Sequence, residues 1–231
     1  MLDKSPQKIS AMFDEIAPTY DKLNHAFTLN LDKVWRKKIV QEILKRKYEK
    51  NRILDLATGT GDLALELVNL YPEVLVAADF SKEMLDYQRR KKSNPLIELV
   101  EADASNLPFN DVYFDIVTIG FGVRNFFDLK KCLKEISRVI KPGGRLIVLE
   151  IFKSNGVINK IFNFYFGKVV PAFGNRVSGS SHAYSYLFNS VENFHTLDEF
   201  GGICKEFSFE QEFKENNFLG IVNTIYFCKK K

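Results

Sequence analysis

Short apolar runs alternate with helical stretches from residue 52 onward, and this alternation constrains the fold more than any other feature of the sequence. Strands are expected at 52–57, 74–80, 97–102, 114–119 and 145–152, with helices at 61–70, 81–92 and 128–140. Strands separated by helices pair in parallel through right-handed crossovers. Two further strands, at 207–213 and 221–228, have a short connection at Glu215-Asn216-Asn217 and therefore form an antiparallel hairpin. The sequence predicts an α/β fold, a mostly parallel, doubly wound sheet of seven strands with that hairpin at its edge.

The remaining segments are expected to be largely helical and to belong to the same domain. Apolar spacing predicts one helix that ends near Pro18, a polar-aromatic connection at 20–24 and a second helix over 31–48. A length of 231 residues fits one domain of this class. We divide it into an N-terminal helical cap (1–50), a cofactor-binding core (51–152), an acceptor-side helical insertion (153–195), and a final helix with the edge hairpin (196–231). Pro142-Gly143-Gly144 is expected to form a turn, and Gly201-Gly202 weakens the final helix.

A glycine loop connects the first expected strand to the next helix, in the sequence Leu54-Asp55-Leu56-Ala57-Thr58-Gly59-Thr60-Gly61-Asp62. Gly59 and Gly61 permit a tight turn and the close approach of a ligand to the backbone. With Ala64 they match the fingerprint G-x-G-x-x-A, and Asp79 lies 20 residues after Gly59, where an acid can hold a ribose diol. The loop predicts either a nicotinamide or flavin dinucleotide or S-adenosylmethionine as the cofactor.

The charges around the loop separate these cofactors. Asp55 and Asp62 flank the turn, and no Lys or Arg lies between Arg52 and Lys82. Two carboxylates repel a pyrophosphate, but they attract the sulfonium and ammonium groups of S-adenosylmethionine, by on the order of a few kcal/mol per pair before desolvation. Asp103, at the end of the third strand, can accept a hydrogen bond from an adenine amino group. The sequence therefore favours S-adenosyl-L-methionine.

Several segments resemble known enzymes. Asp55 to Gly61, Asp79-Phe80-Ser81 and Lys141-Pro142-Gly143-Gly144 resemble the class I S-adenosylmethionine-dependent methyltransferases. More specific segments resemble the ubiquinone/menaquinone biosynthesis C-methyltransferases: Phe13-Asp14-Glu15-Ile16-Ala17 followed by Tyr20-Asp21 and Asn24, Trp35-Arg36, Gly120-Phe121-Gly122-Val123-Arg124-Asn125, and Tyr184-Ser185-Tyr186-Leu187 followed by Ser190. The likeness runs from about residue 9 to about residue 225. It implies a Rossmann-like fold with helices on both faces, and methylation of a ring carbon in a prenylated quinol. Demethylmenaquinol is the principal expected acceptor, and the benzoquinol of the ubiquinone pathway is a second one.

The resemblance and the loop together assign residues to the cofactor. Thr58, Asp79, Asp103, Ala104 and Gly120 fall where the family contacts S-adenosylmethionine, and Asp55, Gly59, Gly61 and Phe80 complete the predicted cofactor site. No metal ligand set is expected, because the cysteines and histidines have no metal-binding spacing.

The candidate catalytic residues follow from their places in the chain. Arg124 follows a strand end, at the crevice where such folds bind ligands, so it can stabilise the phenolate of the quinol and hold a water that relays its proton. Asn125 can orient Arg124 or contact a quinol oxygen. Tyr20 and Tyr184 are candidates for closing the site, and His182, in a serine-rich loop, is a candidate base.

Charge and hydropathy constrain partners and location. The whole net charge of +4 lies in the first fifty residues, mainly in Arg36-Lys37-Lys38 and Lys45-Arg46-Lys47. A solvated helix face accounts for this excess and an anionic membrane surface is the alternative, whereas the excess is too small to predict nucleic-acid binding. No signal-peptide core or bilayer-spanning run is present, so we expect a cytoplasmic protein, with peripheral contact at the inner membrane face and homodimer formation left open.

Phenylalanine occurs 21 times, and 13 of these residues lie in 151–231. A long isoprenoid tail requires apolar surface beyond the protein's own core. Core packing accounts for many of these residues. We expect the remaining excess to form an acceptor-side surface, with 158–173 as a wall, and the cofactor to be held by the aromatic-poor half before it. Methylation of another small molecule, an NAD-dependent oxidoreductase and a non-enzymatic binding module remain the alternatives.

Overall fold

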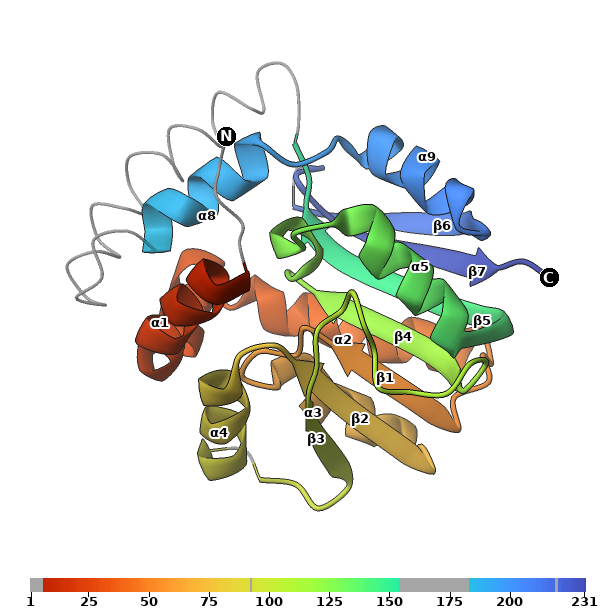
Figure 1. Ribbon diagram of the computed structural model, residues 1–231, viewed down its shortest axis with the longest axis horizontal. Helices are drawn as coiled ribbons and strands as arrows, with labels where there is room; N and C mark the ends of the chain where they lie inside the picture. The colour runs from red at the N-terminus through yellow and green to blue at the C-terminus, as the bar shows by residue number, and fades with distance from the viewer. Residues whose placement is uncertain (1–5, 92, 154–182, 219) are drawn as a thin grey trace.

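Seven strands form one sheet in the computed structural model, which describes residues 6–91, 93–153, 183–218 and 220–231 (Figure 1). They are β1 (Arg52–Leu56), β2 (Val74–Asp79), β3 (Ile97–Glu101), β4 (Phe114–Gly120), β5 (Ile140–Ile151), β6 (Phe209–Phe218) and β7 (Val222–Lys229). Their order is β3-β2-β1-β4-β5-β7-β6. The first five pair in parallel, and β7 is antiparallel to both β5 and β6. The predicted α/β sheet with an antiparallel hairpin at its edge is confirmed.

Helices cover both faces of this sheet. On one face, α2 (Leu31–Lys45) and α3 (Asp62–Leu67) pack in one apolar cluster, continued by the short η1 (Val68–Leu70). On the other, α5 (Leu129–Val139) and α9 (Leu197–Glu206) pack in a second cluster. The described part of the chain also contains α1 (Pro6–Phe27), α4 (Lys82–Lys91), η2 (Val123–Asn125) and α8 (Ala183–Glu192). α8 lies within the expected helical insertion, although no separate helix was predicted at its position.

Three helix starts follow from local chemistry that the sequence shows. The Asp128 side chain accepts a hydrogen bond from the Lys131 backbone N–H at the start of α5. Ser81 Oγ accepts from the Met84 N–H at the start of α4. Thr196 and Glu199 form a capping box that starts α9, which continues through both of its glycines.

The prediction that the first helix ends near Pro18 is wrong, because α1 continues through this residue to Phe27. A proline inside a helix costs roughly 3 kcal/mol through a lost hydrogen bond and a steric clash. Contacts with the rest of the molecule offset that cost, since α1 packs against α4 (Figure 1). Ser81 Oγ donates to Asp14 Oδ1 at 2.5 Å, and the Tyr87 hydroxyl donates to the Pro18 carbonyl at 3.3 Å.

Two predicted turns lie inside strands instead. β5 starts at Ile140 and includes Pro142-Gly143-Gly144, where the register with β4 shifts, so this segment is a bulge. In the hairpin, β6 continues through Glu215-Asn216-Asn217 to Phe218. β6 is an edge strand, and alternate residues along it face solvent, so polar residues fit there without ending the strand.

The described phenylalanines of the last third mostly build the core. Phe152, Phe194, Phe200, Phe209 and Phe227 are buried together on the α9 face of the sheet. Core packing accounts for these residues, because the final helix and the hairpin need large apolar side chains to fill the space between them. The expected wall at 158–173 lies outside the described residues. No described helix is both long and apolar enough to cross a bilayer.

Candidate active site

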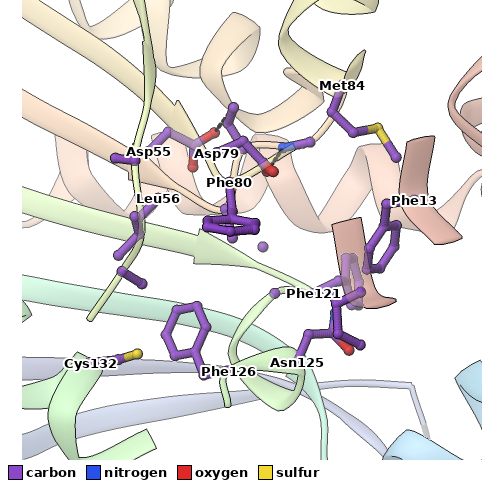
Figure 2. A pocket seen from close by; sticks show the side chains of 18 of the residues that line it. Phe13, Asp55, Leu56, Asp79, Phe80, Met84, Phe121, Asn125, Phe126 and Cys132 are labelled. Atoms are coloured by element: carbon purple, nitrogen blue, oxygen red, sulfur yellow. Dashed lines mark hydrogen bonds between the residues drawn. The ribbon is translucent and has the colours of Figure 1, made fainter. Parts of the chain in front are cut away.

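A cavity of about 390 Å³ lies at the carboxyl ends of the central strands, within the range of roughly 300–1,000 Å³ for small-molecule sites. Most of the predicted cofactor residues line it: Asp55, Thr58, Gly59, Asp79, Phe80, Asp103, Ala104 and Gly120. Phe13 and Tyr20 of α1 and Arg36 of α2 complete the wall. Figure 2 shows the rings of Phe13, Phe80, Phe121 and Phe126 around the cavity beside two carboxylates. Among the described residues, its aromatic lining comes from the first 130 positions, because these elements meet at the strand ends.

The glycine loop has the backbone conformation that the sequence predicts. Gly59 and Gly61 have φ of +57° and +81°, in the left-handed region that favours glycine. Gly61 lies just behind the lining residues, and a Cβ there would be 2.2 Å from Cδ of Gln88. Asp79 holds the loop against β2, since its carboxylate accepts from the backbone N–H of Gly59 at 2.7 Å and of Ser81 at 2.9 Å.

Asp55 and Asp79, the acids at the carboxyl ends of β1 and β2, have raised pKa values. Asp55 accepts hydrogen bonds from the hydroxyls of Thr118 and Thr58, both at 2.7 Å. Burial nevertheless raises the pKa of Asp55 to about 6. Burial also raises the pKa of Asp79, although the N–H groups of Ser81 and Gly59 oppose that shift. A cationic ligand in the cavity would favour the ionised form of both groups.

The segment after β4 is strained where it meets the cavity. Phe121 has φ of +59°, an unfavourable value for a bulky side chain, and strain of this kind clusters at functional sites. A Cβ on Gly122 would lie 2.5 Å from the Cβ of Ala57, so the two loops touch. The Phe121 carbonyl accepts a hydrogen bond from Arg124 Nη1 at 2.7 Å, which holds this backbone in place.

Arg124 is buried beneath this segment and is not among the described residues that line the cavity. Its Nη1 also donates to Glu150 Oε1 at 2.5 Å, and its Nε donates to Ser190 Oγ of α8 at 3.2 Å. Its charge still acts at the cavity wall: burial raises the pKa of Tyr20, and Arg124 and Arg36 oppose that shift. The structure therefore places Arg124 as a link between the strained loop, β5 and α8.

A family model matches residues 1–230 and is described as the ubiE/COQ5 methyltransferase family. The chain belongs to this family. Among similar proteins, a demethylmenaquinone methyltransferase of Chlorobaculum tepidum is 42% identical over 212 residues, which cover 90% of this chain and 86% of that protein. The ubiquinone/menaquinone biosynthesis C-methyltransferase UbiE of Geotalea daltonii is 40% identical over 237 residues, 99% of each chain. A solved SAM-dependent methyltransferase from Thermotoga maritima has the same fold, with a TM-score of 0.66 at 18% identity over 95% of this chain and 99% of that one.

The other candidate catalytic residues of this methyltransferase have different surroundings. Asn125 lines the cavity, and its hydrogen-bond partner is the Tyr186 hydroxyl at 3.1 Å rather than Arg124. Tyr186 comes from α8, and burial raises its pKa to about 12. Tyr184 lies in the first turn of α8, but its side chain is outside what the structure describes, as is the whole of His182. The roles of these residues stay predictions.

The sequence did not predict that charged residues of the N-terminal cap are buried against the cavity and the glycine loop. Arg36 was expected on a solvated helix face, yet it is buried and lines the cavity, while Lys37 and Lys38 are exposed. Asp21 of α1 is also buried, accepts from the Thr60 hydroxyl of the glycine loop, and lies 3.1 Å from Lys91 Nζ. The signal was the resemblance itself, because Trp35-Arg36 and Tyr20-Asp21 are among its specific segments.

Proposed function

We propose that this chain methylates a ring carbon of a prenylated quinol with S-adenosylmethionine as the methyl donor, and that demethylmenaquinol is its principal acceptor. Membership of the ubiE/COQ5 methyltransferase family supports the reaction class. The names of similar proteins, demethylmenaquinone methyltransferase and ubiquinone/menaquinone biosynthesis C-methyltransferase, support the quinol acceptor. The observation that carries the choice of donor is the acidic cavity at the carboxyl ends of the strands.

The charges of the lining fit S-adenosylmethionine better than a dinucleotide. Five acids line the cavity, Asp55, Asp62, Asp79, Asp103 and Asp128, while its described basic residues are Arg36 and Lys131. An acidic lining repels a pyrophosphate and favours a sulfonium and an ammonium. When bound, S-adenosylmethionine supplies a methyl group activated by its positive sulfur. The acidic lining therefore disfavours a nicotinamide dinucleotide, and with it the NAD-dependent oxidoreductase.

The residues that would hold the donor follow the order of the strands. In our proposal Asp79, at the end of β2, binds the ribose hydroxyls, and Asp103 and Ala104, after β3, bind the adenine; all three line the cavity. The exposed ring of Phe80 offers an apolar surface between them. Thr58 and Gly59 after β1, and Gly120 at the end of β4, then face the methionyl part.

On the acceptor side, the chain must favour the phenolate of the quinol, because free phenols titrate near ~10. Arg124 contributes a positive charge that Glu150 and the Phe121 carbonyl hold in one place. Asn125 borders the cavity and contacts a quinol oxygen in our proposal, with Tyr186 fixing its amide. Preorganised groups of this kind stabilise developing charge without reorganising during the reaction.

The test is to incubate the protein with radiolabelled S-adenosylmethionine and a panel of demethylated naphthoquinols and benzoquinols. We expect label in the naphthoquinol product. No labelled quinone in any reaction would refute the acceptor, and binding of NAD without binding of S-adenosylmethionine would establish the oxidoreductase. Measured at a temperature where the variant is folded, Arg124→Ala should keep cofactor affinity and lose turnover, whereas Asp79→Ala should weaken cofactor binding itself.

A further inference from the structure

Arg36 is a buried cation that the N-terminal cap inserts into the cavity wall. Its side chain is 9% exposed. Both of its ion pairs use Nη1, which contacts Asp32 Oδ2 of the same helix and lies 3.6 Å from Asp62 Oδ2 at the start of α3. A guanidinium has five N–H donors, and the Nε and Nη2 hydrogens of Arg36 have no acceptor among the described residues. Arg36 lines the cavity, and N–H donors of a cation that face a cavity favour an anionic ligand.

The surrounding side chains hold Arg36 in this position. Asp32 accepts hydrogen bonds from the Thr28 hydroxyl at 2.7 Å and lies 2.7 Å from His25 Nδ1. Burial raises the pKa of Asp32, but Arg36 and these hydrogen bonds outweigh it and hold the pKa below its usual value. His25 Nε2 in turn lies 3.6 Å from Asp62 Oδ2. These residues fix the guanidinium before any ligand arrives.

Arg36 lies at the end of the cavity opposite to the expected adenine site. Its guanidinium carbon is 5.9 Å from the ring centroid of Phe121, which follows β4. Figure 2 shows Phe121 and Cys132 on different sides of the cavity. Lys131, the other basic residue among the described lining, is next to Cys132 on α5, and the charge of Asp103 also acts on that cysteine. The adenine end and the Arg36 end are therefore separate.

The proposed donor runs from adenine near β3, over ribose at β2, to the methionyl group at β1 and β4. Its methionyl end carries an ammonium and a carboxylate on one carbon, so it needs an acid and a base a few ångströms apart. Asp62 and Arg36 supply this pair at 3.6 Å, and both line the cavity. An acidic site without Arg36 would repel the carboxylate.

We propose that Arg36 binds the α-carboxylate of S-adenosylmethionine through its Nε and Nη2 hydrogens, with Asp32 and His25 as positioning residues and Asp62 facing the ammonium. This inference rests on the proposed function. The N-terminal cap, which lies outside the sheet, then completes the cofactor site. Arginine suits this role because its planar fork matches a carboxylate with two parallel hydrogen bonds.

The experiment compares two ligands that differ only in this carboxylate. Calorimetry measures the binding of S-adenosylhomocysteine and of its decarboxylated analogue to the wild-type chain, Arg36→Met and Lys37→Met. The wild type should prefer S-adenosylhomocysteine by roughly 10- to 100-fold, the range for hydrogen bonds to charged groups. Arg36→Met should weaken the binding of S-adenosylhomocysteine by that factor, change the affinity for the analogue by no more than about twofold, and so abolish the preference. Lys37→Met removes an exposed charge from the same helix and should behave as wild type.

Each other result has a definite meaning. A wild type that binds neither ligand overturns the proposed donor together with this inference. A wild type that binds both equally, or Arg36→Met that keeps the wild-type preference, overturns the inference and leaves the proposed function standing. Arg36→Met with unchanged binding but no turnover would assign Arg36 to the quinol oxygen instead. Where Arg36→Met does not fold, Arg36→Lys decides: it keeps the charge but loses the fork, so an unchanged preference overturns the inference.

Discussion

Glu150→Ala should lower the free energy of unfolding far more than the loss of one exposed charge would. Glu150 is fully buried, and its Oε1 accepts from Arg124 Nη1 at 2.5 Å and from the Ile151 backbone N–H at 2.7 Å. Its Oε2 accepts from the Arg124 backbone N–H at 3.3 Å. The alanine variant removes the Glu150 carboxylate from the buried Arg124 guanidinium, and the backbone N–H groups of Arg124 and Ile151 lose this acceptor.

The magnitude follows from the burial of both partners. Removing one member of a buried ion pair costs about 3–5 kcal/mol, because the remaining charge cannot regain its hydration. For a chain of this length each kcal/mol shifts the melting temperature by about 2–4 °C, so we expect a loss of roughly 6–20 °C. The hydrogen bond from Arg124 Nη1 to the carbonyl of the strained Phe121 is also weakened, since Glu150 no longer holds the guanidinium in place.

The assay is urea denaturation together with thermal melting of the wild type, Glu150→Ala and Glu206→Ala. Glu206 forms an ion pair with Lys130 at 2.7 Å, but both side chains are more than half exposed, so its removal should cost at most about 1 kcal/mol. Replacing Arg124 and Glu150 together by methionine should restore most of the stability, because no unpaired charge remains. Equal losses for Glu150→Ala and Glu206→Ala would refute the reasoning.

Three further predictions concern pH, the glycine loop and the final helix. Burial raises the pKa of Asp55 from 3.8 to about 6, so the folded chain holds this proton more tightly than the unfolded chain and loses stability as pH rises between these values. Urea titrations across this pH range should show that Asp55→Asn lacks this loss, which is on the order of 3 kcal/mol in the wild type, and parallel pH profiles of the two proteins would contradict the prediction. Gly61→Ala should lower the affinity for S-adenosylhomocysteine in calorimetry, because the new Cβ clashes with Gln88 and the backbone φ is unfavourable for alanine. The control is Gly143→Ala, where φ is +80° but no atom lies within 4 Å of the new Cβ, so this variant should lose only about 1–2 kcal/mol of stability and no affinity. Gly202→Ala should raise the free energy of unfolding by about 0.5–1 kcal/mol, because this position lies inside α9 and a Cβ there meets no atom within 4 Å; an unchanged urea midpoint would argue against it.

Local patterns predicted the sheet and much of the cofactor site. The strands and helices between residues 52 and 140 lie within a few residues of their expected places, because periodicity and capping are properties of short stretches of chain. Asp79 and Asp103 could be placed at one cavity because parallel strands of one sheet end at the same edge. The predicted helix end near Pro18 and the predicted turn at Pro142-Gly143-Gly144 were wrong, because distant segments hold those backbones in place.

The sequence by itself determined the fold class, the glycine loop, the acids at the strand ends and, by resemblance, the family. Only the tertiary structure decided which charges face inward. Arg36 belongs to a basic run that looks like a solvated surface, and its partner Asp62 lies in a different helix. Arg124 and Glu150 are 26 residues apart on different elements. A strand or helix is specified by its neighbours in the chain, but the partner of a buried charge depends on how separate elements pack, which no local pattern encodes.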